Sequence, residues 1–147
     1  MTEAELETYL HDNIPLTRAM AVRVVSIAPD KVVLGAPLAP NINVHDTVFG
    51  GSASTLATIT AWSLVYTRLL AAGRTCDLVI QRSTMEFIKP IRGDFTAVAV
   101  MSDGPEWADF LHMLDRKGRA RITVEATLDF ADARAGLFRG DFVALRS

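Results

Sequence analysis

The sequence predicts an α+β domain in which a mostly antiparallel sheet wraps around one long buried helix. No charged residue occurs between Thr47 and Thr67, and the chain runs from Ser52 to Gly73 without an internal proline or glycine. A helix that lacks a charged face must be enclosed on most of its sides. Strand patterns elsewhere in the chain, most clearly the apolar and polar alternation over 119–130, supply a sheet that can enclose it.

The chain before the long helix reads as a short helix, a hairpin and a loop. Thr2 followed three residues later by Glu5 has the pattern of a capping box, and it predicts an amphipathic helix that ends before Pro15. A turn-length segment leads into a hairpin of two strands over 22–34. Prolines and asparagines over 37–43 prevent regular pairing, so a loop of about ten residues is expected to reach Gly51.

The long helix is predicted to begin with Ser52 as its N-cap and to end at Gly73, which gives about twenty residues or roughly 30 Å. Its serines and threonines, and the lack of flanking basic clusters, favour a buried helix and exclude a membrane span. The elements expected after it are strands at 78–88 and 94–101, an amphipathic helix at 106–114, and strands at 119–130 and 136–145. Residues 1–147 are therefore expected to form a single domain.

Composition excludes several classes of partner. The 15 basic and 17 acidic residues nearly cancel and form no basic stripe, so nucleic acid is not expected. One cysteine, Cys76, allows neither an internal disulfide nor a zinc site, and we expect no metal and no cofactor. The acidic N-terminus lacks the pattern of a secretory signal, so the cytoplasm is the expected location.

The segment 43–52 is the strongest candidate site because it places polar side chains before the start of a helix. The N–H groups of Gly50 and Gly51, with the positive end of the helix dipole, can polarise a carbonyl or hold an oxyanion. Asn43 could hold the water or the carbonyl, and Asp46 or His45 could act as general base. Alternatively, the glycines allow tight packing, Asn43 satisfies loop backbone groups, and His45 and Asp46 are solvated.

The spacing from Asn43 to Phe49-Gly50-Gly51 resembles that from an Asn to a His-Gly-Gly in the hotdog acyl-CoA thioesterases. The chain resembles more closely the YiiD-type thioesterase domain, which some bacteria carry C-terminal to an acetyltransferase. The resemblance implies a hotdog fold, hydrolysis of an acyl-CoA or acyl-carrier-protein thioester, and a homodimer or dimer of dimers with sites between subunits. The segments that resemble this family are Ile14-Pro15-Leu16, the run over 36–43, Thr47-Val48-Phe49-Gly50-Gly51-Ser52 and Val79-Ile80-Gln81-Arg82.

Two positions depart from the thioesterase pattern. Phe49 stands where His is usual, and Thr58 stands eight residues after Gly50, where the resemblance implies an Asp or Glu. Threonine cannot act as a base at neutral pH, so a carboxylate must come from Asp46 or, as a second choice, from Glu86. Thr58 is retained as a residue that could bind water or substrate, although buried threonines more often bond their own backbone.

The predicted site therefore contains two groups of residues. The catalytic group is Asn43, Asp46, Gly50, Gly51 and Thr58, and the substrate-binding group is His45, Phe49, Ser52, Arg82 and Thr84. Arg82 and Thr84 share one face of a strand, where a surface ion pair of Arg82 is the plainer interpretation. Two other functions stay open: a module that binds acyl thioesters without hydrolysis, and a hydratase or dehydratase, for which adjacent His45 and Asp46 are a poor fit.

Overall fold

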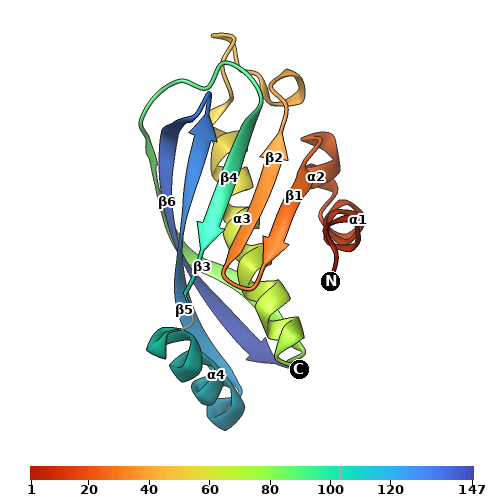
Figure 1. The fold of residues 1–147 in the computed structure, drawn as a ribbon, viewed down its shortest axis with the longest axis vertical. Helices are drawn as coiled ribbons and strands as arrows, with labels where there is room; N and C mark the ends of the chain where they lie inside the picture. The colour runs from red at the N-terminus through yellow and green to blue at the C-terminus, as the bar shows by residue number, and fades with distance from the viewer. Residues whose placement is uncertain (103) are drawn as a thin grey trace.

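A computed structural model describes residues 1–102 and 104–147 of the chain. Six strands form one antiparallel sheet in the order β1-β2-β4-β5-β6-β3 (Figure 1). The strands are β1 Arg23–Ala28, β2 Lys31–Ala36, β3 Cys76–Phe87, β4 Phe95–Val100, β5 Arg119–Phe130 and β6 Ala133–Arg146. The helices are α1 Glu3–Asn13, α2 Pro15–Ala19, the 3-10 turn η1 Ala39–Asn41, α3 Gly50–Ala71 and α4 Pro105–Lys117. The predicted α+β class is confirmed.

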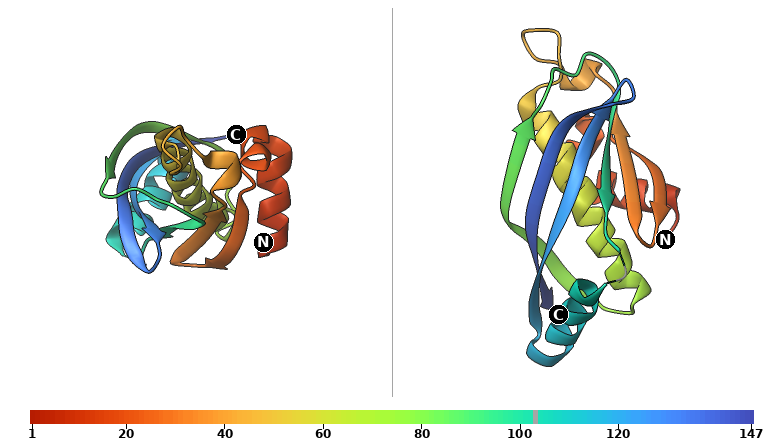
Figure 2. Two further views of the ribbon diagram at one scale, coloured as in Figure 1. Left: turned by 90° about the horizontal axis from the view of Figure 1, so that it is seen from above. Right: turned by 60° about the vertical axis from the view of Figure 1, so that its left-hand side comes forward.

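The sheet curves around α3, as the view from above in Figure 2 shows. Leu56 and Leu64 of α3 are fully buried, and the helix packs mainly against strands β2 to β6. On β5 the predicted alternation holds, with Ile122 and Val124 buried between exposed polar neighbours. The expectation that a sheet encloses the uncharged helix is therefore confirmed. Within the described ranges, no helix is long and apolar enough to cross a membrane.

The start of α3 differs from the prediction. Helical backbone begins at Gly50, so the expectation that Ser52 is the N-cap is wrong. Phe49 takes the N-cap position with ψ 133°, and its carbonyl accepts the N–H of Ala53 at 3.0 Å. Both glycines therefore lie in the first helical turn, where their N–H groups have no helical acceptor. At the other end the helix stops at Ala71 with Ala72 as its C-cap, one residue before the glycine C-cap that was predicted, and Gly73 follows with φ +73°.

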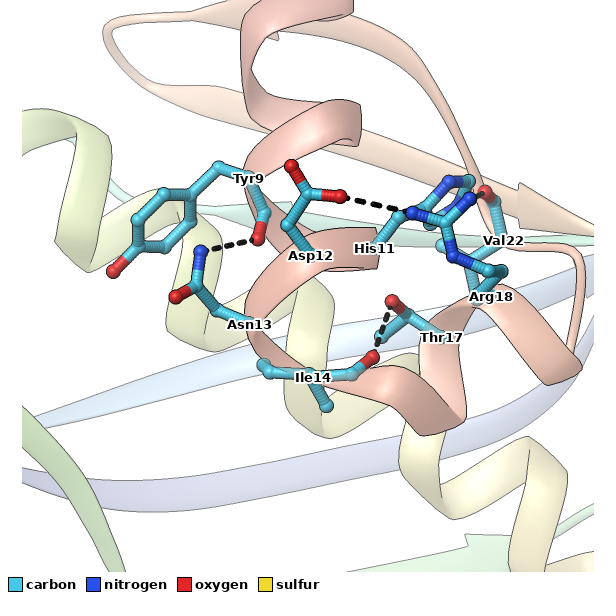
Figure 3. Close-up of polar contacts among 8 residues, drawn as sticks. All are labelled: Tyr9, His11, Asp12, Asn13, Ile14, Thr17, Arg18 and Val22. Carbon is cyan, nitrogen blue, oxygen red and sulfur yellow. Dashed lines mark hydrogen bonds and ion pairs between the residues drawn. The ribbon is translucent and has the colours of Figure 1, made fainter.

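The segment after α1 also gains structure that its sequence did not reveal. The expected turn after α1 is the short helix α2, with Pro15 at its first position. Thr17 Oγ1 donates to Ile14 O at 2.8 Å, and Arg18 pairs with Asp12 at 2.9 Å (Figure 3). These contacts fix the angle between α1 and α2.

Helix α1 covers the outer edge of β1, the first strand of the sheet (Figure 1). The Glu7 carboxylate accepts the N–H of Val24 at 2.8 Å. One turn later, His11 Nε2 donates to Val22 O at 2.7 Å (Figure 3). Two side chains on one face of α1 thus make hydrogen bonds that a seventh strand would otherwise make.

Strand β3 forms the opposite edge and pairs only with β6. Three of its apolar side chains are exposed, Val79 by 49%, Ile80 by 39% and Phe87 by 60%. A bulge between Ile80 and Arg82 shifts the register of pairing with β6. This edge presents an unpaired, partly apolar strand to its surroundings.

Candidate functional site

Asn43 organises the loop that precedes α3. Its Oδ1 accepts the N–H groups of His45 at 2.8 Å and Thr47 at 3.2 Å. Its Nδ2 donates to Thr47 Oγ1 at 2.9 Å and to Val48 O at 3.4 Å. Both ends of the amide are therefore engaged inside the loop, as in the interpretation that Asn43 satisfies loop backbone groups.

Asp46 and His45 lie at the exposed tip of this loop. Asp46 has φ +62°, and its N–H donates to Asn43 O at 3.3 Å, which closes a turn. Aspartate is one of the few residues that tolerate this left-handed conformation. The shape of the turn alone therefore accounts for an aspartate at position 46.

Backbone hydrogen bonds fix the two residues that precede α3. Phe49 N–H donates to Asn41 O at 2.7 Å, and Val48 N–H donates to Ile91 O at 2.9 Å. Nothing within 1–102 and 104–147 accepts a hydrogen bond from the N–H groups of Gly50, Gly51 or Ser52. These free donors lie at the positive end of the dipole of a 22-residue helix, which makes them suited to an anionic or strongly polar oxygen.

Two exposed phenylalanine rings flank this turn. The Phe49 ring lies against the Cα atom of Gly51, where any larger residue would meet it. The Phe87 ring lies beside Gly50, 3.6 Å from where a methyl group at position 50 would be. Phe49 is 57% exposed and Phe87 is 60% exposed, so the two rings add exposed apolar surface beside the glycines of this turn.

A cavity of about 380 Å³ opens beside Gly50. Most of its lining residues are apolar, Lys89 is its single charged residue, and it contains no Asp, Glu or His. The lining residues are Thr47, Val48, Gly50, Ala53, Phe87, Ile88, Lys89, Pro90, Ile91, Leu128 and Ala135. A larger cavity of about 660 Å³ between β1, β4 and the β5–β6 turn is more polar and has no α3 residue in its lining.

The other predicted site residues lie apart from this cavity. Thr58 Oγ1 donates to Ser54 O at 2.8 Å, so it bonds its own helix. Arg82 and Thr84 alternate along β3 with Met85, which pairs with the buried Phe138 on the helix side of the sheet. Arg82, Thr84 and Glu86 are exposed and therefore lie on the opposite face of the sheet.

Of the predicted site residues, only Gly50 lines the cavity, and Phe49, Gly51 and Ser52 adjoin it at the start of α3. Sequence reasoning missed Phe87, Ala53 and Ala135. The pair Phe87-Ile88 before Pro90 was the one available signal, because two large apolar residues ended a strand whose other residues are largely polar.

The antiparallel sheet wrapped around α3 is the hotdog fold. The family model described as "Putative thioesterase (yiiD_Cterm)" matches residues 3–146, and the chain belongs to this family. The predicted family and fold are confirmed.

Solved structures agree along nearly the whole chain. A protein of unknown function from Chlorobaculum tepidum has 29% identity and a TM-score of 0.93, over 99% of this chain and 94% of that one. A "putative thioesterase" from Shewanella oneidensis has 25% identity and a TM-score of 0.88, over 97% and 96%. A thioesterase from Haemophilus influenzae, at 11% identity and a TM-score of 0.78 over 99% and 92%, shares the fold.

Proposed function

We propose that this chain hydrolyses acyl thioesters of coenzyme A or of an acyl carrier protein. The observation that supports this most is the row of free N–H groups at Gly50, Gly51 and Ser52 beside an apolar cavity. A thioester carbonyl that points at these groups becomes more electrophilic, and the oxyanion formed by water attack is stabilised by the same donors. Collapse of that intermediate expels the thiolate and leaves the free acid.

The mechanism also requires a general base that activates the water. No carboxylate lines the cavity within the described chain, so the base must reach the water from its rim. Asp46 on the preceding loop is our first candidate. Glu86 is the second; it lies on the outer face of β3, so a second copy of the chain would have to supply it.

We also propose a homodimer formed through β3, with two dimers able to associate further. The free edge of β3 and its exposed apolar side chains suit pairing with the same strand of a second copy. Because Phe87 of β3 lines the cavity, such pairing would place the second copy close to the site. The family relationship and its implied sites between subunits support the same arrangement.

The test is thiol release from a panel of acyl-CoA esters by Gly50→Pro and Gly50→Ala variants. Position 50 is the first residue of the helix, where proline is tolerated, and Phe49 has φ −58° and ψ 133°, which suit a residue before proline. Gly50→Pro removes one N–H, whereas Gly50→Ala keeps it and adds a comparable side chain. We expect kcat to fall about 100-fold to 1,000-fold for proline relative to alanine.

Equal rates for these two variants would show that the Gly50 amide plays no part in the reaction. The base is identified in the same assay with Asp46→Asn, which preserves the left-handed turn, and Glu86→Gln. Substitution of the residue that acts as the base is expected to lower kcat about 100-fold or more with little change in melting temperature. If neither variant loses activity, neither residue is the base.

A second candidate function is binding of an acyl thioester without hydrolysis. The observation that favours it is the cavity lining without a carboxylate, together with Thr58 bonded to its own backbone. In this case acyl-CoA would raise the melting temperature in proportion to the logarithm of its concentration, and no thiol would be released. A measurable rate with any acyl-CoA rejects this candidate.

A further inference from the structure

We infer that the cavity beside Gly50 is an acyl pocket, which selects straight, uncharged acyl groups of short to medium length. Ala53 and Ala135 set that length. The inference rests on the proposed function, because it places the thioester carbonyl at the Gly50 amide. It goes further by assigning the substrate class and the residues that limit it.

The position of the cavity fixes the direction of the acyl chain. Gly50 and Phe87 both line the cavity, whereas Phe49 and Gly51 do not. With its carbonyl at Gly50, the acyl chain passes Phe87 into the cavity. The thiol part of the substrate then extends on the other side, over Phe49.

The walls of the cavity come from three parts of the same chain. The first turns of α3 supply Gly50 and Ala53, the end of β3 and the segment after it supply residues 87–91, and the β5–β6 hairpin supplies Leu128 and Ala135. A second copy paired along β3 would approach the cavity at Phe87, on the side opposite the buried residues Ala53, Leu128 and Ala135 that set the acyl preference.

The most buried part of the lining is apolar. Leu128 is 1% exposed, and Ala53 and Ala135 are each 2% exposed, and we place the closed end of the pocket at these residues. The exposed Ile88 and Lys89 lie at the rim, and Lys89 carries the only charge. An acyl group that ends in a carboxylate or hydroxyl would bury that group without a partner, which costs about tenfold to more than 100-fold in kcat/KM.

The volume of the cavity limits the length of the acyl chain. A volume of about 380 Å³ lies near the lower end of the range of about 300–1,000 Å³ for small-molecule pockets. Two of the three innermost side chains are alanines, the smallest that still provide a side-chain surface. Larger residues at these two positions would shorten the space directly.

The experiment measures kcat/KM against straight-chain acyl-CoA esters of increasing length. Each methylene that enters the pocket is expected to raise kcat/KM about fourfold until the pocket is full, after which the values level off or fall. We call the chain length at which kcat/KM stops rising the break. Ala53→Val should move the break to a chain shorter by about one or two methylenes. A dicarboxylic acyl-CoA of favourable length should react about tenfold or more slowly than its apolar counterpart.

Ala57→Val is the matched control. Ala57 is buried on α3 one turn further along and does not line the cavity, so the same substitution there should leave the break in place. Melting temperatures of both variants separate a change in pocket shape from a loss of folded protein. Ala135→Val, on a different element, provides the same test if Ala53→Val does not fold.

Binding of non-hydrolysable alkyl-CoA thioethers separates this inference from the proposed hydrolysis. If thioethers bind with a break that Ala53→Val shortens, while thioesters are not cleaved, the pocket is supported and the hydrolysis is rejected. If thioesters are cleaved but neither Ala53→Val nor Ala135→Val moves the break, the hydrolysis is supported and the pocket is rejected. Absence of binding at every chain length also overturns the pocket.

Discussion

The two edges of the sheet differ in whether another element of the chain covers their backbone groups. At the β1 edge, Glu7 and His11 of α1 bond Val24 N–H and Val22 O, so a helix occupies the place of a neighbouring strand. At the β3 edge no helix or strand runs alongside, and apolar side chains are exposed within the described chain.

This difference teaches where the molecule can accept a partner. An open edge strand is a template for pairing, and folded proteins usually cover such edges or use them. Here the same sheet has one edge of each kind. The covered edge protects the monomer, and the open edge is available to a second copy of the chain.

The largest effect is expected from a charge on the open edge. Val79→Lys places two like charges in the proposed β3–β3 interface and should weaken the dimer about 30-fold or more, corresponding to about 2 kcal/mol. Val25→Lys on β1 is the matched control, because Val25 is 48% exposed and Val79 is 49% exposed. Sedimentation at several concentrations measures both. Equal effects of the two substitutions would remove the distinction between the edges.

A smaller effect is expected from uncovering the closed edge. Glu7→Ala leaves the N–H of Val24, a residue only 9% exposed, without its acceptor. The free energy of unfolding should fall by about 1–2 kcal/mol, and light scattering should show more self-association. Glu7→Gln keeps an acceptor oxygen and should recover most of the loss in denaturant unfolding. Full stability of Glu7→Ala would mean that the α1 contact is dispensable.

Cys76, the first residue of β3, reports on the open edge. Burial, and to a lesser extent the charge of Asp77, raise the pKa of the Cys76 thiol. Because only the thiolate reacts, labelling at pH 8 should be slower than for the same thiol in the unfolded chain. Val79→Lys should leave this rate unchanged, because Trp62 occupies the outer carbonyl of Leu78 and the proposed partner strand would pair beyond it. Equal rates in folded and unfolded protein would contradict the raised pKa.

The smallest effect concerns the turn between α3 and β3, where Arg74 pairs with Asp115 of α4 at 2.6 Å. The hydrogen bond from Arg74 holds the pKa of Asp115 below its usual value. A lowered folded pKa contributes stability above the unfolded pKa of about 4, and that stability is lost as the pH falls through the folded value. Asp115→Asn should therefore lower the melting temperature slightly at pH 6 and not at pH 2. A constant difference would show that the charge is unimportant.

Patterns of burial made the fold predictable, and local backbone geometry was harder to infer. The uncharged stretch after Thr47 and the alternation along β5 both require an enclosed helix and a sheet with one buried face, which the structure has. The start of α3 was misplaced because Gly50 and Gly51 are poor helix formers by propensity. Tertiary contacts of Val48 and Phe49 fix the chain there and override that preference.

The site was only partly predictable for a similar reason. Free N–H groups at a helix start follow from the chain order alone, so Gly50 and Gly51 could be named from the sequence. The cavity joins Ala53, Phe87 and Ala135, which are far apart in the chain: the pairing of β3 with β6 brings Phe87 near Ala135, and the packing of α3 on the sheet adds Ala53. The use of both ends of the Asn43 amide inside its own loop depends on a turn whose shape no motif specifies.

The indole of Trp62 gives the open edge a direction. Arg146 N–H donates to Gly118 O and so points toward β5, and by alternation the backbone groups of Ala144 also point toward β5. Leu78 pairs with Ala144, so the Leu78 carbonyl points away from β6. Trp62 Nε1 donates to this carbonyl at 2.8 Å. A partner strand would find this acceptor already occupied, so its pairing would begin beyond Leu78. The twofold axis of such a dimer would then lie nearer to Phe87 than to Cys76, and this offset would bring the second chain to the mouth of the cavity.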